Sequence, residues 1–199
     1  MIKPSSNCES DEEPSVITTH EQVVFADTDT LSAFLWRDAF NYLIKLFQKY
    51  GIEIILPQQV MEELKYNLRT QQHLADPVLM ELKKGTLTVK DLEILTAEYV
   101  TYIDLTEKKA LGSGESAALS MAIHSSRPAS IASSNLRDVR KIAEENHLKI
   151  WTTATVIRAC VDEKIMTENR ASDLWKKMLE NKVKLPYDTY AEYAVKGTI

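Results

Sequence analysis

Five short apolar runs that alternate with stretches of helical periodicity constrain the fold of this chain most strongly. Each run is four or five residues long and is bounded by polar residues, as is typical of strands. The runs cover residues 23–26, 52–56, 86–89, 129–133 and 148–151. Because strands that alternate with helices are joined by crossover connections, the pattern predicts a parallel sheet covered by helices on both faces.

The stretches between these runs carry apolar residues three and four positions apart, which predicts helices. Gly51 and Gly85 stand where two of these helices are expected to end, and Pro57 suits the first turn of a helix better than a central strand. Ser113 can cap the helix that follows a Gly-Ser-Gly turn. We expect helices over residues 31–50, 57–68, 76–84, 91–110, 114–123, 136–146, 153–165 and 168–181.

The composition is that of a globular protein. The chain has 199 residues, of which 44% are hydrophobic and 27% charged, and no apolar run approaches a membrane span of about 18 residues. Its two cysteines, Cys8 and Cys160, are too few for a disulfide framework in a chain that can bury an adequate core. We therefore expect a cytoplasmic protein with reduced thiols and no membrane partner.

The charge is acidic, with 24 basic and 29 acidic residues and a net charge of −5. A global basic field of the kind that drives non-specific nucleic-acid binding is excluded, so any such contact must be local. Residues 1–20 contain an acidic run and lack the apolar segment of a signal peptide. We expect them to form a disordered tail, followed by an α/β domain over 21–160 and a helical extension over 161–199 that packs on the same domain.

Acidic and amide side chains follow the expected strands or open the helices behind them. They are Asp27, Asp29, Glu62, Glu63, Glu115, Asn135 and Asp138. Because the carboxyl ends of parallel strands meet at one sheet edge, these carboxylates would repel one another unless a cation lay between them. Oxygen ligands suit Mg²⁺ or Mn²⁺, and the four histidines show no zinc-ligand spacing. Such a site can activate water for phosphodiester hydrolysis.

Three of the aspartates have an ordinary structural explanation as well. Asp27 can cap the helix after the first strand instead of binding a metal ion. Asp29 lies nearer the expected helix start, so we expect it to cap that helix or to support Asp27. Asp138 can be a ligand, a supporting residue, or an acid that the helix dipole favours in a first turn.

Glu63 and Glu115 can likewise serve only the helix dipole. Val60 and Leu64 are expected to be buried, which places Glu63 at the edge of the inward face and within reach of a cleft. Two glycines precede Glu115 and allow a close backbone approach that a dipole role leaves unexplained. These patterns favour a role for both glutamates in a metal site.

Small polar and basic residues surround the proposed site. They are Ser133, Ser134, Asn135, Arg137 and Arg140. The polar residues can hydrogen-bond a ligand water or a phosphate, or can simply be loop residues, and the arginines can contact RNA phosphates or be solvated. We expect the three tryptophans in the core or at an interface rather than under stacked bases, namely Trp36, Trp151 and Trp175.

Four segments resemble the motifs of PIN-domain nucleases. They are residues 25–31, 56–64, 111–119 and 132–139. The family's functional acids in the first three fall on Asp27, Glu63 and Glu115. Asp29 stands where the family more often has Asn. Asn135 stands where many members have Asp, so the fourth carboxylate is either Asp138 or absent. The order and spacing of the four segments make the resemblance specific.

The resemblance implies an α/β/α sandwich with a central parallel sheet, and an endoribonuclease that uses Mg²⁺ or Mn²⁺ to cleave RNA. Residues 111–115 have the Leu-Gly-x-Gly-Glu form found in toxin-like members, which implies the toxin of a toxin–antitoxin pair, with an antitoxin partner and a homodimer. The alternative is a non-catalytic RNA-binding or protein-interaction module, because Asn135 replaces an acid. A receiver-like phosphoryl-transfer regulator is a third hypothesis, but the carboxylates come from four separate segments.

Overall fold

The computed structural model describes residues 21–68 and 75–197. The expected disordered tail over residues 1–20, which includes Cys8, lies outside these ranges. Cys160 is a free, buried cysteine, and burial raises the pKa of its thiol to about 12. No helix in the described ranges is both long and apolar enough to cross a membrane.

The centre of the molecule is a five-stranded parallel sheet with the strand order β3-β2-β1-β4-β5. The strands are β1 Val23–Ala26, β2 Glu53–Pro57, β3 Leu87–Lys90, β4 Ala129–Ala132 and β5 Lys149–Trp151. Phe25 of the central strand pairs with Ile55 on one side and Ile131 on the other. The sheet confirms the predicted α/β class and all five predicted strands.

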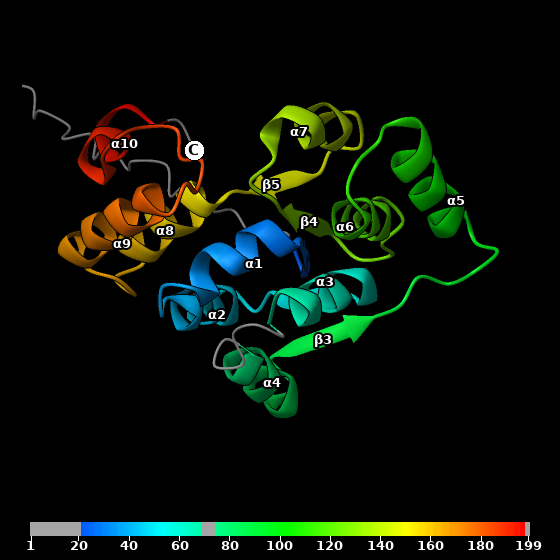
Figure 1. Cartoon of the computed structure of the whole chain (residues 1–199), viewed down its shortest axis with the longest axis horizontal. Coiled ribbons are helices and arrows are strands. Elements are labelled where there is room, and N and C mark those ends of the chain that lie inside the picture. Colours follow the sequence, from blue (N-terminus) through cyan, green and yellow to red (C-terminus); the bar gives the residue numbers. More distant parts are fainter. Residues whose placement is uncertain (1–20, 69–74, 198–199) are drawn as a thin grey trace, which may run out of the picture.

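Helices cover both faces of this sheet, as the crossover connections require. They are α1 Thr28–Leu35, α2 Phe40–Lys49, α3 Gln58–Leu68, α4 Ala75–Lys84, α5 Ala97–Ile103, the π-helical turn η2 Asp104–Lys108, α6 Ser113–Ile123, α7 Leu136–Glu145, α8 Thr153–Asp162, α9 Glu168–Glu180 and α10 Tyr190–Lys196. Figure 1 shows α8, α9 and α10 gathered at one end of the molecule and α5 at the other.

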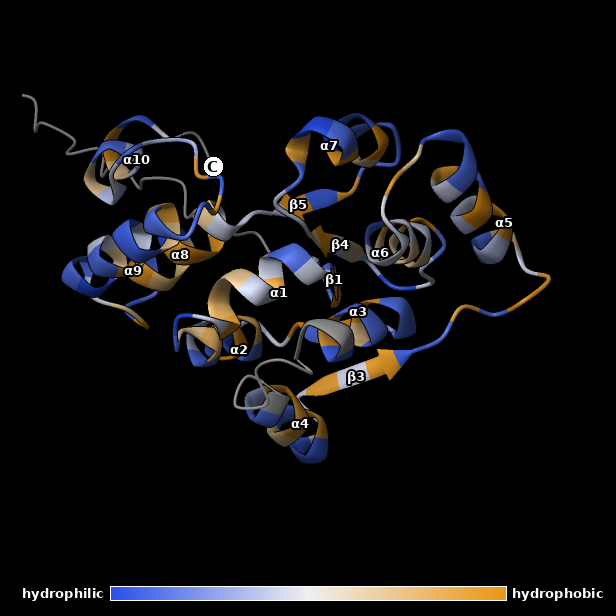
Figure 2. Cartoon of the chain, in the orientation of Figure 1, coloured by the Kyte–Doolittle hydropathy of each residue, from blue (hydrophilic) through white to orange (hydrophobic). Residues whose placement is uncertain are grey.

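The two faces bury two hydrophobic clusters. Val24 and Ala26 belong to the cluster under α1–α4 and α8–α10, whereas Val23 and Phe25 belong to the cluster under α5–α7. Successive strand residues point to opposite faces, so every residue of β1 is buried. Figure 2 shows the matching pattern on helices such as α5 and α7, which carry apolar and hydrophilic residues on different sides. The arrangement is an α/β/α sandwich.

Several element boundaries differ from the prediction. The single helix expected over residues 31–50 is two helices, because Asp38 adopts a left-handed backbone with φ +53° that interrupts the helix. Pro57 ends β2 instead of opening α3, since the last strand position needs no further hydrogen bond from its nitrogen. Helix α10 lies beyond the last helix that the periodicity predicted. Gly51 and Gly85 follow α2 and α4 with φ +67° and +73°, which confirms both predicted helix ends.

The C-terminal helices share the hydrophobic cluster of the α/β part. Trp175 of α9 is 1% exposed and belongs to the same cluster as Leu43 and Phe47 of α2. Its indole nitrogen donates to the Tyr187 carbonyl oxygen at 2.9 Å, and its ring stacks on Tyr193 with centroids 5.1 Å apart. We propose that residues 161–199 pack on the 21–160 domain and unfold together with it.

Replacing Trp175 by alanine tests this organisation. We predict that Trp175→Ala lowers the free energy of unfolding by about 3–5 kcal/mol, because it leaves a large cavity in a shared core. Leu95→Ala is the control, since that side chain is 95% exposed, and it should change stability by less than about 0.5 kcal/mol. Urea unfolding followed by circular dichroism gives both values. Two separate unfolding transitions in the native chain would contradict the single unit.

Candidate functional site

Asp27 lies at the carboxyl end of the central strand and caps helix α1. Its backbone N–H donates to the Ala132 carbonyl oxygen at 2.9 Å, and its Oδ1 accepts from the N–H groups of Asp29 at 2.6 Å and Thr30 at 3.4 Å. The residue is 4% exposed, and this burial raises the pKa of its carboxyl to about 6. A hydrogen bond from Ser133 lowers this pKa, and the negative charge of Asp29 raises it further. Asp27, and not Asp29, is therefore the helix cap.

Glu63 of α3 joins three helices through both of its carboxylate oxygens. Its Oε2 accepts from the Thr28 hydroxyl of α1 at 2.5 Å, and its Oε1 accepts from the Gly114 N–H of α6 at 2.8 Å. Thr28 was not predicted as a site residue, although it stands between Asp27 and Asp29 in the first motif. The contacts bring the first, second and third motif segments together at one place.

Gly114 explains one of the two glycines in the third motif. A Cβ atom at this position would lie 2.8 Å from Glu63 Oε2, closer than real Cβ atoms approach, and 3.0 Å from Val60 Cγ2, which is also tight. Gly112, by contrast, has open space around it and is the N-cap of α6. The expectation that Ser113 caps this helix was wrong, because Ser113 is the first helical residue and its Oγ lies 3.1 Å from the Tyr102 hydroxyl.

Glu115 is half-buried in the first turn of α6 and experiences three other carboxylates. Burial raises the pKa of its carboxyl to about 7, with a further contribution from the Asp27 charge and smaller ones from Asp138 and Asp29. We call Asp27, Asp29, Glu115 and Asp138 the carboxylate cluster. Glu63 borders this cluster, since its carboxylate is held by the Thr28 hydroxyl and the Gly114 N–H.

Asn135 lies between two members of the carboxylate cluster. Its Nδ2 donates to Glu115 Oε2 at 3.3 Å and to Asp138 Oδ2 at 3.0 Å. Arg137 forms an ion pair with Asp138 at 3.2 Å. The hydrogen bonds from Arg137 and then Asn135 lower the pKa of the Asp138 carboxyl. Asp138 therefore stays charged where Asp27 and Glu115 resist ionisation.

The serines after β4 fix the loop that carries Asn135. The Ser133 hydroxyl accepts from the Asn135 N–H at 3.2 Å, and Ser134 Oγ lies 2.7 Å from Thr153 Oγ1 and 3.2 Å from Thr30 Oγ1. Arg140 is exposed and lines a cavity on the far side of the α7 N-terminus. The structure thus places Ser133 beside Asp27, and Arg140 away from the carboxylate cluster.

The chemistry of the donor set fits an oxygen-preferring cation, although the side chains do not form a complete cage. Within the described ranges, no three His, Cys, Asp or Glu side chains are arranged to hold one metal ion. Mg²⁺ keeps several of its waters and needs only one or two direct carboxylates. Asp27 and Glu115 can meet that need. The positive charge of a cation would offset the desolvation and the carboxylate repulsion that raise their pKa values.

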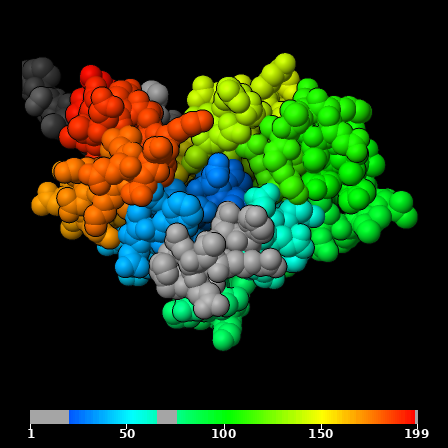
Figure 3. All heavy atoms as spheres, viewed as in Figure 1, coloured from blue at the N-terminus to red at the C-terminus, as the bar shows by residue number. Residues whose placement is uncertain are grey.

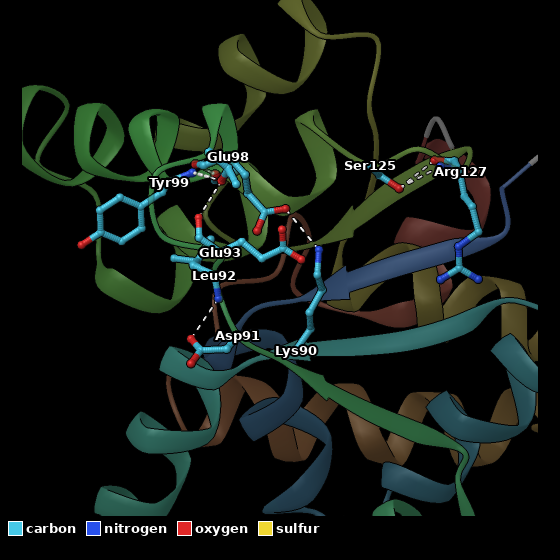
Figure 4. A network of polar contacts seen from close by, with 10 residues as sticks. Lys90, Asp91, Leu92, Glu93, Glu98, Tyr99, Ser125 and Arg127 are labelled. Atoms are coloured by element: carbon cyan, nitrogen blue, oxygen red, sulfur yellow. Dashed lines mark hydrogen bonds and ion pairs between the residues drawn. The ribbon is translucent and has the colours of Figure 1, made fainter.

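A second buried carboxylate belongs to the scaffold. Glu98 of α5 is 8% exposed, its Oε2 pairs with Lys90 Nζ at 3.2 Å, and its backbone oxygen accepts from the Ser120 hydroxyl of α6. Figure 4 shows Lys90 reaching from the end of β3 to Glu98. The ion pair ties α5 to the edge strand β3, and the Ser120 hydrogen bond ties α6 to α5. None of these three residues belongs to the carboxylate cluster.

The raised pKa of Glu115 predicts how stability depends on pH in ion-free protein. The folded carboxyl has a pKa of about 7 against an ordinary value of 4.5, so its contribution is full below pH 4.5 and is lost as pH rises through about 7. The difference in free energy of unfolding between native protein and Glu115→Gln should therefore fall between pH 4.5 and 7. Urea unfolding in EDTA measures it, with Glu62→Gln as the exposed control. A difference that stays flat or rises would contradict the shift.

Comparisons with known proteins place this chain in a family. A family model described as a PIN domain matches residues 23–196. Among solved structures, the chain is similar to one in the crystal structure of VapBC2 from Rickettsia felis bound to a DNA fragment from their promoter. The two are 18% identical, with a TM-score of 0.48, over 65% of this chain and 98% of that chain. No curated protein matches. Since the family model spans most of the chain, the chain belongs to the PIN-domain family.

Proposed function

We propose that the chain is a metal-dependent endoribonuclease that hydrolyses RNA phosphodiester bonds. The observation that carries this proposal is the pairing of the buried Asp27 carboxyl with the half-buried Glu115 carboxyl at the carboxyl end of the central strand. The Asp27 charge raises the pKa of Glu115, and both groups would gain from a nearby positive charge. PIN domains are generally nucleases that use divalent metal ions, and membership in the family supports the same function.

Asp27 and Glu115 would hold the Mg²⁺ or Mn²⁺ ion. When bound, the ion supplies an activated water and stabilises charge at the phosphorus and the leaving oxygen. Asp27 is fixed by its own helix cap, and Glu63 fixes Thr28 and Gly114 on either side. We assign the catalytic and metal-binding roles to Asp27, Glu63, Glu115 and Asp138, and the supporting or substrate-contacting roles to Asp29, Ser133, Asn135, Arg137 and Arg140.

A cation at this position also explains how an acidic protein attracts RNA. The carboxylate cluster repels a phosphodiester on its own, and a divalent cation reverses the sign of the local charge. Arg137 already lies on the rim, with its side chain 88% exposed and its guanidinium against Asp138. The ion would thereby attract a phosphodiester to the place where hydrolysis would occur.

A second candidate function is a non-catalytic PIN-fold module that binds RNA or another protein. One observation favours it, namely that the Asn135 amide nitrogen donates to both Glu115 and Asp138. This amide brings hydrogen-bond donors, rather than a third charge, between two carboxylates. A metal ion that used both carboxylates would require Asn135 to turn its amide oxygen inward or to move aside.

RNA cleavage distinguishes these two candidates. We predict that the purified chain cleaves an unstructured RNA in Mn²⁺ or Mg²⁺, and that Asp27→Asn and Glu115→Gln each lower the rate by about 100-fold or more through loss of ion binding. Glu62→Gln is the matched control, because Glu62 is the exposed neighbour of Glu63. A native chain that is inactive while Asn135→Asp cleaves would support the binding module. Equal cleavage by all of these variants would contradict the proposed site.

We also propose that the chain is the toxin of a toxin–antitoxin pair in the cytoplasm, with an antitoxin partner and a homodimeric form. The Leu-Gly-x-Gly-Glu form of residues 111–115 supports this role, together with membership in the PIN-domain family. An antitoxin that covers the carboxylate cluster would block both the ion and the RNA.

Expression in a bacterial host tests the toxin role. We predict that induction of the native chain without its genomic neighbour arrests growth, because uncontrolled RNA cleavage stops protein synthesis. Asp27→Asn, produced to the same level, should allow normal growth, and growth curves with quantitative immunoblots measure both. Normal growth in the presence of abundant chain that cleaves RNA in vitro would contradict the toxin role and leave the nuclease intact.

A further inference from the structure

A cavity of about 600 Å³ opens beside the carboxylate cluster. Three segments line it, namely α1 with Trp36 at its end, the start of α7, and the segment that follows α9. Asp29 and Asp138 line the cavity and also belong to the carboxylate cluster. The cavity is therefore continuous with the proposed catalytic site and has room for part of a substrate near the reacting bond.

Trp36 lies in the wall of this cavity, at the end of α1. Its side chain is 51% exposed, whereas Trp151 and Trp175 are 3% and 1% exposed. Trp151 and Trp175 are thus in the core, as expected, whereas Trp36 is outside it, and for Trp36 the interface alternative stays a prediction. An indole that borders a polar cavity offers an apolar face on which a planar base can stack.

The opposite wall carries positive charge. Lys182 and Lys184 line the cavity, both residues are exposed, and neither forms an ion pair with any residue in the described ranges. Lys184 is near enough for its charge to favour the ionised form of Asp138. The two lysines come from a segment far from the four motif segments in sequence, so they add cations where those segments supply mainly acids.

A buried arginine holds the tryptophan wall and the lysine wall together. Arg37 is 8% exposed, its Nη1 donates to the Ala33 carbonyl oxygen at 3.1 Å, and its Nε donates to the Lys177 carbonyl oxygen at 3.5 Å. Its positive charge lies at the last turn of α9, where the helix dipole favours a cation. The distance between Trp36 and the segment after α9 is therefore fixed by the fold.

The hollow continues past the start of α7. A second cavity of about 730 Å³ shares Ser134, Leu136 and Lys184 with the first and extends to Arg140 and Tyr187. Figure 3 shows the blue surface of α1 between the orange C-terminal segment and the yellow surface of α7. We call the two cavities together the lysine groove. Lys184 lies where its two parts join.

We propose that the lysine groove binds an unpaired RNA strand, with a base stacked on Trp36 and phosphates at Lys182 and Lys184. This assignment rests on the proposed nuclease function, because the groove leads to the carboxylate cluster. Paired bases are already stacked within a duplex, so a stacking platform selects single-stranded RNA. The C-terminal extension then determines which RNA reaches the site, in addition to packing on the domain.

Binding of a fluorescein-labelled 12-nucleotide oligouridylate, followed by anisotropy in EDTA, tests the groove without cleavage. We expect Trp36→Ala to weaken binding about 10-fold or more through loss of stacking, and Trp36→Phe, which keeps an aromatic ring, to bind within about 3-fold of the native chain. Lys182→Gln with Lys184→Gln should weaken binding and reduce the slope of log K against log salt by about 1.4, since each phosphate contact contributes about 0.7. A hairpin RNA of equal length should bind more weakly.

Lys45→Gln with Lys176→Gln is the matched control, because both lysines are exposed, line neither cavity and change the net charge equally. Circular dichroism verifies that each variant folds. Native affinity in both the Trp36→Ala and the lysine-groove variants would overturn the proposal, as would equal binding of the hairpin or binding of an acidic peptide in preference to RNA.

Different results would overturn the lysine-groove proposal and the nuclease proposal. RNA cleavage in Mn²⁺ with unchanged kcat/KM in Trp36→Ala and the lysine-groove variant would overturn the groove and leave the nuclease. Loss of oligouridylate binding in these variants, with no cleavage by the native chain in any divalent ion, would support the groove and overturn the nuclease.

Discussion

Electrostatic repulsion between the buried Asp27 carboxylate and the half-buried Glu115 carboxylate is the constraint on which the rest of the site depends. Both groups lose solvation on folding, and the Asp27 charge makes ionisation of Glu115 less favourable. Without a cation, the fold accommodates them by binding protons, with pKa values of about 6 and 7. The proposed divalent ion would offset the same repulsion near neutral pH and would add a positive charge that attracts phosphate.

The surrounding structure holds this unfavourable pair in place. Asp27 is fixed by the helix it caps, and Glu63 joins Thr28 to the Gly114 backbone, so α1, α3 and α6 meet at one point. A side chain at position 114 would disrupt that meeting. The core beneath is buried on both faces of the sheet, which gives the rigidity that a preorganised site requires.

The sequence was sufficient to predict the strands, the sandwich and the acids at the sheet edge, because each depends on local pattern and on the rule that parallel strands end together. It could not locate the break at Asp38, since a left-handed residue leaves no periodic trace. The two hydrogen bonds of Glu63, and the cavity that Trp36 and Lys184 both line, depend on contacts between residues that are distant in the chain. Asn135 was noted as a departure from the motif, but its bond to two carboxylates needed the structure.

The most direct test of the cation site is anomalous diffraction from crystals of the native chain soaked in Mn²⁺. We expect an anomalous peak between Asp27 and Glu115, with an oxygen of each carboxylate bonded to the ion and the Asn135 amide turned or displaced from Glu115. The absence of a peak at saturating Mn²⁺, with the Asn135 amide still bonded to Glu115 and Asp138, would contradict the account.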